Sequence, residues 1–234
     1  MPKGKKIVMA AVMCGGLAAS PVAYADTPGS PASAVKATAT ASSGSVDVTI
    51  DGTKVFAGAV GPCSADGPVM GSTRGGLAGT IAEFGNGEAL CGRGTDGTAV
   101  GQAKGARFKT TVLKAYGGPE IDVRTFTAQC STTAVGAGGY VEVGTVTGIT
   151  VPANIPANYT ITVPAPDPGA PPLADVVLNE SVSPTPPDGS LTTNTLHIKL
   201  FPQGGPASGD IYVGTAACDP YGSSRKTAKP VPQP

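Results

Sequence analysis

Hydrophobic and polar residues alternate with a period of two in several short stretches of the chain. In SVDVTI, residues 45–50, valine and isoleucine alternate with serine, aspartate and threonine, which is typical of a half-buried β-strand. Asp51-Gly52 follows as a strong turn dipeptide, and the apolar pair Val55-Phe56 comes next. The stretch therefore predicts a β-hairpin.

The same alternation recurs along the chain, and glycine and proline separate the runs. Since 34 Gly and 23 Pro interrupt almost every window of a dozen residues, long helices are not expected. About nine strands with turn residues between them predict an all-β fold, an antiparallel β-sandwich with long Gly/Pro-rich loops; a barrel is the alternative. A change of phase at Gly144 predicts a bulge. The later strands are expected within residues 107–112, 121–130, 139–152, 159–163, 174–183, 191–201 and 210–218.

Residues 61–105 are rich in glycine and contain only brief apolar pairs. Leu77, Ile81 and Phe84 fit a short helical turn, whereas Thr80 to Phe84 fits a short strand. The pattern alone leaves both interpretations open.

The N-terminal 25 residues have the pattern of a secretory signal peptide. MPKGKK is basic, an apolar run of residues 7–19 follows, and Ala23 and Ala25 are the small residues of a cleavage site. Cleavage is expected between Ala25 and Asp26. Lipidation at Cys14 is the rival interpretation, and the bulky Met13 before it disfavours this processing. The apolar run is shorter than the roughly 20 residues of a membrane span, so no integral membrane segment is expected after removal of the signal.

The remaining chain divides by composition into three parts. Residues 26–44 are low in complexity and have few large apolar groups, which predicts a flexible linker. Residues 45–220 carry the strand pattern and form the predicted β-sandwich domain. Residues 221–234, which include SSRKTAKPVPQP, have no core residues and predict a disordered basic, proline-rich tail.

The charge balance excludes a nucleic-acid partner. Removal of the signal takes Lys3, Lys5 and Lys6 from the 16 basic residues and leaves 13 against 16 acidic ones. A nucleic-acid binder would concentrate basic residues on one face. The partner is instead expected to be an unknown extracellular or cell-envelope component.

Cysteine usage agrees with export. Cys63, Cys91, Cys130 and Cys218 remain after the signal is removed, an even number in an exported chain. Three pairings are possible, and we favour Cys63–Cys91 with Cys130–Cys218. The first would close a glycine-rich segment, and the second would tie a mid-chain strand to the last one. A zinc site is not expected, since the chain has no C-x-x-C pair and one histidine.

The only histidine, His197, lies in LTTNTLHIKL, residues 191–200. Leu196, Ile198 and Leu200 share one face by the two-residue period, and Thr195, His197 and Lys199 share the other. His197 is therefore expected to point to solvent or to a rim. The sequence offers no nucleophile pattern such as G-x-S-x-G, so no catalytic residue is predicted.

Two further motifs are weak indications of a binding site. GRGTDG at residues 92–97 fits G-x-G-x-x-G without the strand-to-helix context that nucleotide binding needs. Asp47, Asp51 and Asp96 precede or form turns and could hold calcium at loop ends. No cofactor, nucleotide or metal site is predicted from these patterns.

Paired carboxylates are the remaining route to an enzyme. Glu120 and Asp122 share a strand face, and the other candidate acids are Glu83, Glu88, Glu142 and Glu180. The chain has no Trp, six Tyr and five Phe, so it is poor in aromatic platforms for sugars. Convergence of Glu120, Asp122 and His197 on one cleft would favour a hydrolase.

The C-terminal segments resemble the choice-of-anchor P family of actinobacterial exported proteins. A late strand with Asn194, Leu196 and His197 precedes a final strand with Val213, Gly214, Ala216 and Cys218. The resemblance implies an exported surface protein of unknown function. No LPxTG-like signal or apolar C-terminal helix is present, so simple secretion is expected as readily as anchoring.

Together these patterns predict a secreted or cell-surface β-domain with a non-enzymatic structural or adhesive role. The alternatives are a secreted hydrolase with a carboxylate site built from loops, and a module that binds calcium or another ligand.

Overall fold

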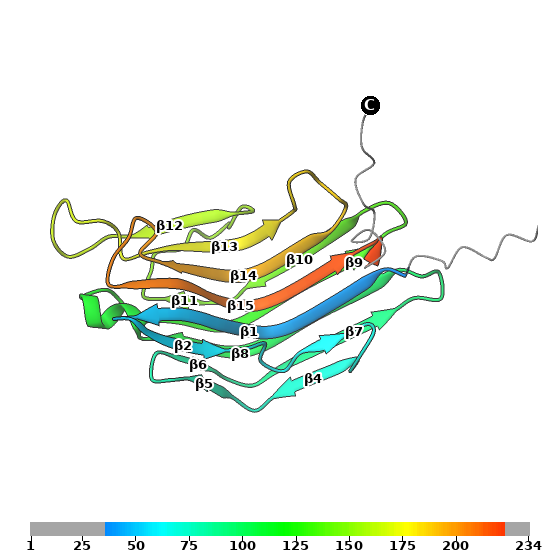
Figure 1. Cartoon of the computed structure of the whole chain (residues 1–234), viewed down its shortest axis with the longest axis horizontal. Coiled ribbons are helices and arrows are strands. Elements are labelled where there is room, and N and C mark those ends of the chain that lie inside the picture. The colour runs from blue at the N-terminus through cyan, green and yellow to red at the C-terminus, as the bar shows by residue number, and fades with distance from the viewer. Residues whose placement is uncertain (1–35, 223–234) are drawn as a thin grey trace, which may run out of the picture. The chain divides into compact units, whose positions relative to one another are not determined.

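The computed structural model describes residues 36–222 and shows two antiparallel β-sheets packed face to face (Figure 1). The predicted all-β sandwich is confirmed. The predicted signal peptide, residues 26–35 of the predicted linker and nearly all of the predicted tail lie outside the described residues.

The seven-stranded sheet has the order β12-β13-β14-β15-β1-β2, and β3 also pairs with β1. In Figure 1 these strands follow one another from β12 at the top to β2 below. The predicted hairpin is β1 with β2, paired from Val46–Ala57 to Ile50–Thr53. The strands are β1 (Thr38–Ile50), β2 (Thr53–Ala57), β3 (Cys63–Ser64), β12 (Tyr159–Val163), β13 (Ala174–Val182), β14 (Leu191–Leu200) and β15 (Ala207–Asp219).

The eight-stranded sheet has the order β10-β9-β8-β6-β5; β11 also pairs with β9, and β7 pairs with β8 and β4. Residues 61–105, which the sequence left open, form strands on both sides of Ile81 and no α-helix. A short 3-10 helix, η1 (Val112–Tyr116), connects β8 to β9. The strands are β4 (Met70–Thr73), β5 (Gly76–Ala78), β6 (Ala82–Phe84), β7 (Gly87–Arg93), β8 (Ala99–Thr110), β9 (Ile121–Thr132), β10 (Ala137–Val143) and β11 (Val146–Thr147).

The linker boundary predicted at residue 44 is wrong, because β1 begins at Thr38 and pairs with β15 from Thr38–Asp219 onward. Ala39 and Ala41 are buried. The sequence resembled a linker because these positions carry small side chains. Small side chains are enough to fill the space between the sheets here, because the two sheets approach closely at this end. A Cβ on Gly101 of β8 would lie 2.8 Å from the carbonyl oxygen of Thr40.

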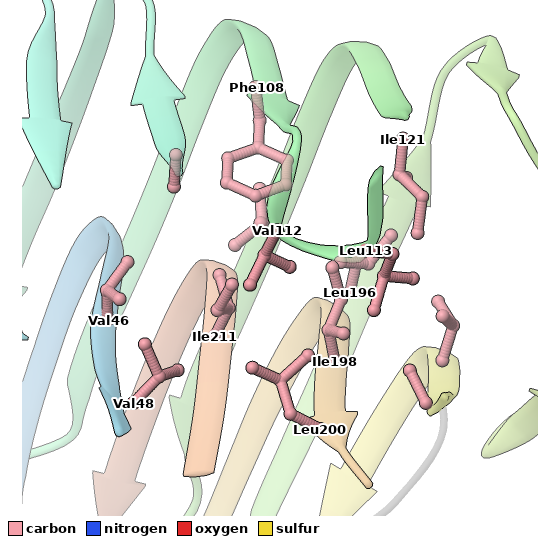
Figure 2. Packing of buried hydrophobic residues seen from close by; sticks show 14 of the residues in the cluster. Val46, Val48, Phe108, Val112, Leu113, Ile121, Leu196, Ile198, Leu200 and Ile211 are labelled. Carbon is pink, nitrogen blue, oxygen red and sulfur yellow. The ribbon is translucent and has the colours of Figure 1, made fainter. Parts of the chain in front are cut away.

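The interior has two parts of different character. One is a cluster of large side chains, including Phe108, Leu113, Ile121 and Leu196 (Figure 2). The other is built of alanine and cysteine. Disulfides Cys63–Cys91 and Cys130–Cys218 are present, the pairing that the spacing favoured, and each joins the two sheets through this alanine-rich part. The two disulfides indicate an oxidising compartment.

The two interiors are separated by a reversal of the pleat in the seven-stranded sheet. On β14 the inward side chains are Thr193 and Thr195, then Leu196 and Ile198. The register places Thr195 in one row with Gly214 of β15 and Asn179 of β13. Gly214 has φ 59° and Asn179 has φ 51°, the left-handed conformation that glycine and asparagine adopt most readily. At this row the alternation of inward-facing and outward-facing side chains shifts by one residue.

The eight-stranded sheet changes phase as well, near Arg107 (φ 69°) of β8 and Gly144. The predicted phase change at Gly144 is present, but the bulge is wrong. The register runs from Val143–Phe126 to Val146–Val123 without an extra residue on either strand.

Candidate functional site

His197 lies on the outer face of the seven-stranded sheet, between two carboxylates. Its Nδ1 is 2.9 Å from Glu180 Oε1 and 3.0 Å from Glu180 Oε2, and its Nε2 is 2.7 Å from Asp210 Oδ1. Residues from β13, β14 and β15 thus meet across three adjacent strands.

The prediction that His197 points to solvent or to a rim is wrong. It lies opposite Leu196 and Ile198, as the period requires, but only 5% of it is exposed. The ring of Tyr212 stacks on it with centroids 4.2 Å apart, and the carboxylates close off both nitrogens. The prediction that Thr195 shares the outer face is also wrong: Thr195 is fully buried and donates from Oγ1 to the Thr127 carbonyl of the other sheet at 3.2 Å.

Asn194 and Thr215 extend the network along the same face. Asn194 Nδ2 donates to Glu180 Oε2 at 2.7 Å, and Thr215 Oγ1 donates to Asn194 Oδ1 at 2.8 Å. Asn194 and His197 are three positions apart, so strict alternation would place them on opposite faces. They share the outer face because the pleat reverses between Thr195 and Leu196.

The contacts of His197 match a ring that carries a proton on each nitrogen. Carboxylate oxygens only accept hydrogen bonds when ionised, and a neutral imidazole has one N–H, whereas the imidazolium donates at both nitrogens. Burial would raise the pKa of Glu180, but hydrogen bonds from His197 and Asn194 and the charges of His197 and Lys199 hold that pKa below its ordinary value. The buried unit is therefore an imidazolium clamped by two carboxylates.

Tyr212 remains a neutral phenol in this setting. Burial raises the pKa of Tyr212, and the negative charges of Asp210 and Glu180 raise it further. Its ring covers His197, and its hydroxyl makes no hydrogen bond to any residue from 36 to 222 that the structure records.

Neither nitrogen of His197 is free to act as a general base. A base must accept a proton from a substrate through an unoccupied nitrogen, and each nitrogen of His197 faces a carboxylate. Glu180 and Asp210 hold opposite edges of one imidazole, which fills the space where paired glycosidase carboxylates would hold a sugar. The arrangement fixes three adjacent strands through their charged side chains.

An open groove of ≈ 1040 Å³ lies on the same face. This volume is at the upper end of the roughly 300–1,000 Å³ typical of small-molecule sites. Residues from β1, β13, β14 and β15 line it, together with residues of β2 and of the segment that follows β2 as far as Pro68. The lining includes Thr40, Ser42, Ser45, Asp47, Phe56, Pro62, Pro68, Glu180, Val182, Thr192, Asn194, His197, Lys199, Tyr212 and Thr215.

Glu120 and Asp122 do not converge with His197. Both belong to the β9 region of the eight-stranded sheet, where Glu120 pairs with Lys109 at 2.9 Å and Lys114 at 3.5 Å. The hydrogen bond from Lys109 is the main cause that holds the pKa of Glu120 low. Of the candidate acids, Glu83, Glu88 and Glu142 also lie on the eight-stranded sheet, and Glu180 alone contacts the histidine.

The aspartates considered for calcium serve local contacts. Asp47 pairs with Lys54 at 3.1 Å, Asp51 occupies the turn between β1 and β2, and Asp96 accepts from Thr98 in the turn after β7. Among residues 36–222 no three His, Cys, Asp or Glu side chains gather in a way that could hold a metal ion. GRGTDG forms this β7–β8 hairpin turn, so a strand rather than a helix follows it.

Sequence reasoning missed Glu180, Asp210 and Tyr212 as partners of His197, and Asn194 as a partner of Glu180. The detectable signal is the antiparallel pairing of the last strands, which sets His197 opposite Tyr212 and Lys199 opposite Asp210. No long apolar helix suited to crossing a membrane occurs within the described part of the chain.

Comparison with known proteins found no matching family model, no matching curated protein and no matching solved structure. The resemblance to the choice-of-anchor P family therefore stays a prediction that rests on the residues quoted above.

Proposed function

We propose that the protein is an exported, non-enzymatic binding domain that holds a cell-surface or extracellular partner in the groove of the seven-stranded sheet. The predicted signal peptide and the two disulfides support export. The groove supports binding, since its volume of ≈ 1040 Å³ suits a small ligand and it crosses four strands.

One observation carries the non-enzymatic part of the proposal: both nitrogens of His197 are occupied by carboxylates. A hydrolytic site needs a base or nucleophile that is free to meet the substrate. Here the most elaborate polar cluster of the outer face is internally satisfied and mostly buried. It supports the floor of the groove rather than attacking a ligand.

The test compares binding to isolated cell envelopes of the producing organism. Thr192 lines the groove on β14, half-buried on the outer face, so Thr192→Trp fills it with a large ring. Thr127, on the central strand β9, is a matched control, since it is also a half-buried threonine but faces outward from the other sheet.

Binding by the wild type and Thr127→Trp, with loss in Thr192→Trp, supports the proposal, provided all three melt at similar temperatures. Equal binding by both variants would overturn the groove as the site. Hydrolysis of envelope material that His197→Ala abolishes in a folded protein would overturn the non-enzymatic role.

A further inference from the structure

We propose that the groove binds an uncharged oligosaccharide, lying across β13, β14, β15 and β1 with its end against Phe56. The inference rests on the proposed function, that is, on the groove being a binding site. It deepens that function by naming the class of ligand.

The backbone of the groove floor is unavailable to a peptide strand. β13, β14, β15 and β1 each pair with a strand on both sides. An extended peptide binds a sheet by adding to an unpaired edge. Among the strands that line the groove, only β2 and the two-residue β3 at its end have such an edge, so the floor itself offers none. A ligand must therefore be recognised by side chains.

The charges of the lining cancel. Asp47 and Glu180 are acids, and Lys199 and the imidazolium of His197 are cations. Two neighbouring residues add one charge of each sign. Asp210 is the second carboxylate that contacts His197, and Lys54 pairs with Asp47. A strongly charged ligand would find no field to complement its charge. An uncharged ligand fits this balance.

The polar groups that remain available are mainly hydroxyls. Ser42, Ser45, Thr192 and Tyr212 line the groove, and their hydroxyls make no recorded hydrogen bond to any residue of the described range. A hydroxyl both donates and accepts. Such a lining matches a ligand that itself presents hydroxyls, because either partner can supply the proton.

An aromatic ring and a carboxylate stand side by side at the end of the groove. Phe56 on β2 is directly opposite Asp47 on β1, and it is 65% exposed. Lys54 pairs with Asp47 at 3.1 Å, and its Nζ lies 5.3 Å from the centroid of the Phe56 ring, so a ligand would share this exposed corner with the ammonium group. A sugar ring offers a C–H face to an aromatic ring and hydroxyl protons to a carboxylate. A lipid chain would instead cover the charges of the floor without replacing their hydration. The pair therefore favours a saccharide over an acyl chain.

The experiment uses the secreted protein and isolated envelopes treated in three ways. Periodate cleaves the vicinal diols of sugars, protease removes proteins, and organic solvent removes lipids. Binding should survive protease and solvent and fall at least about tenfold after periodate. It should also change less than about twofold between low and high salt, since an uncharged ligand is not subject to screening.

Phe56→Ala should weaken binding about fivefold, as expected for loss of one stacking contact of roughly 1 kcal/mol. Leu77→Ala is the control, because Leu77 is 74% exposed on the other sheet. Loss of binding after protease or solvent would overturn the saccharide, as would a steep salt dependence or equal effects of the two variants. Each of these results leaves the groove as a binding site if Thr192→Trp still abolishes binding, so the two proposals fail separately.

Discussion

Thr195 and Leu196 are consecutive residues of β14, and both point toward the eight-stranded sheet. Thr195 Oγ1 donates to the Thr127 carbonyl of that sheet, and Leu196 is fully buried in the cluster of large side chains. The reversal between them brings Asn194 and His197 to the same outer face, where both contact Glu180. The polar network and the floor of the groove therefore depend on this change of pleat.

Gly214→Ala is expected to disrupt the reversal. Gly214 has φ 59°, and an added Cβ would lie 2.5 Å from Thr195 Oγ1 and 2.7 Å from Phe126 Cδ2. The conformation and the crowding together should lower the free energy of unfolding by about 2–4 kcal/mol. Urea unfolding measures this loss. Gly138→Ala, where the added Cβ meets nothing within 4 Å, should change stability by less than about 0.5 kcal/mol. Similar effects at the two positions would contradict the role of Gly214.

His197 and Glu180 should be strongly coupled in a double-mutant cycle. His197→Gln leaves the buried Glu180 carboxylate without its cation, which should cost about 3–5 kcal/mol. In the double variant with Glu180→Gln the unpaired charge is gone, so the combined loss should be smaller than the sum by about 1–3 kcal/mol.

The exposed pair Lys54–Asp47 provides the control for this cycle. Its side chains are 62% and 58% exposed, so Lys54→Gln and Asp47→Asn should couple by less than about 1 kcal/mol. Chemical denaturation of the six variants and the wild type gives both coupling energies. A coupling energy for the buried pair no larger than that of the surface pair would exclude the clamped imidazolium.

Acid should destabilise the protein partly through Glu180. Its pKa in the folded protein lies below the ordinary value of 4.5, so below about pH 4.5 the unfolded chain binds protons that the folded protein still excludes. The stability that this carboxylate contributes is thus complete above that pH and is lost as the pH falls through the folded pKa. The gap in unfolding free energy between wild type and Glu180→Gln should narrow from pH 6 to pH 3, a range of about three units. A constant difference in unfolding free energy would show that protonation of Glu180 does not contribute to the destabilisation by acid.

Local patterns were sufficient for the fold class. The two-residue alternation and the Asp51-Gly52 turn predict the β1–β2 hairpin, and the glycine and proline content excludes long helices. Each of these signals arises within a few residues, where sequence period reports directly which face is buried.

The candidate site could not be predicted because it depends on the exact register of β13, β14 and β15. Glu180 and His197 are separated by 17 residues in sequence, and their contact requires the register of β13 with β14. The single period applied across residues 191–200 also failed at Thr195, because the reversal is imposed by the conformation of Gly214 and Asn179 on neighbouring strands. The sequence of β14 itself contains no signal of the reversal.

The two disulfides should contribute unequally to the free energy of unfolding, although both cross the alanine-rich interior. Alanine buries little apolar area, so the sheets at this end depend on covalent links. Replacing Cys130 and Cys218 by alanine opens a loop with a sequence separation of 88, whereas replacing Cys63 and Cys91 opens one of 28. Each double replacement should cost about 2–5 kcal/mol, and loop entropy makes the first loss larger by about 1 kcal/mol. Urea unfolding of the two double variants tests this order, and a larger loss for the Cys63–Cys91 pair would show that local packing, rather than chain entropy, determines their contributions.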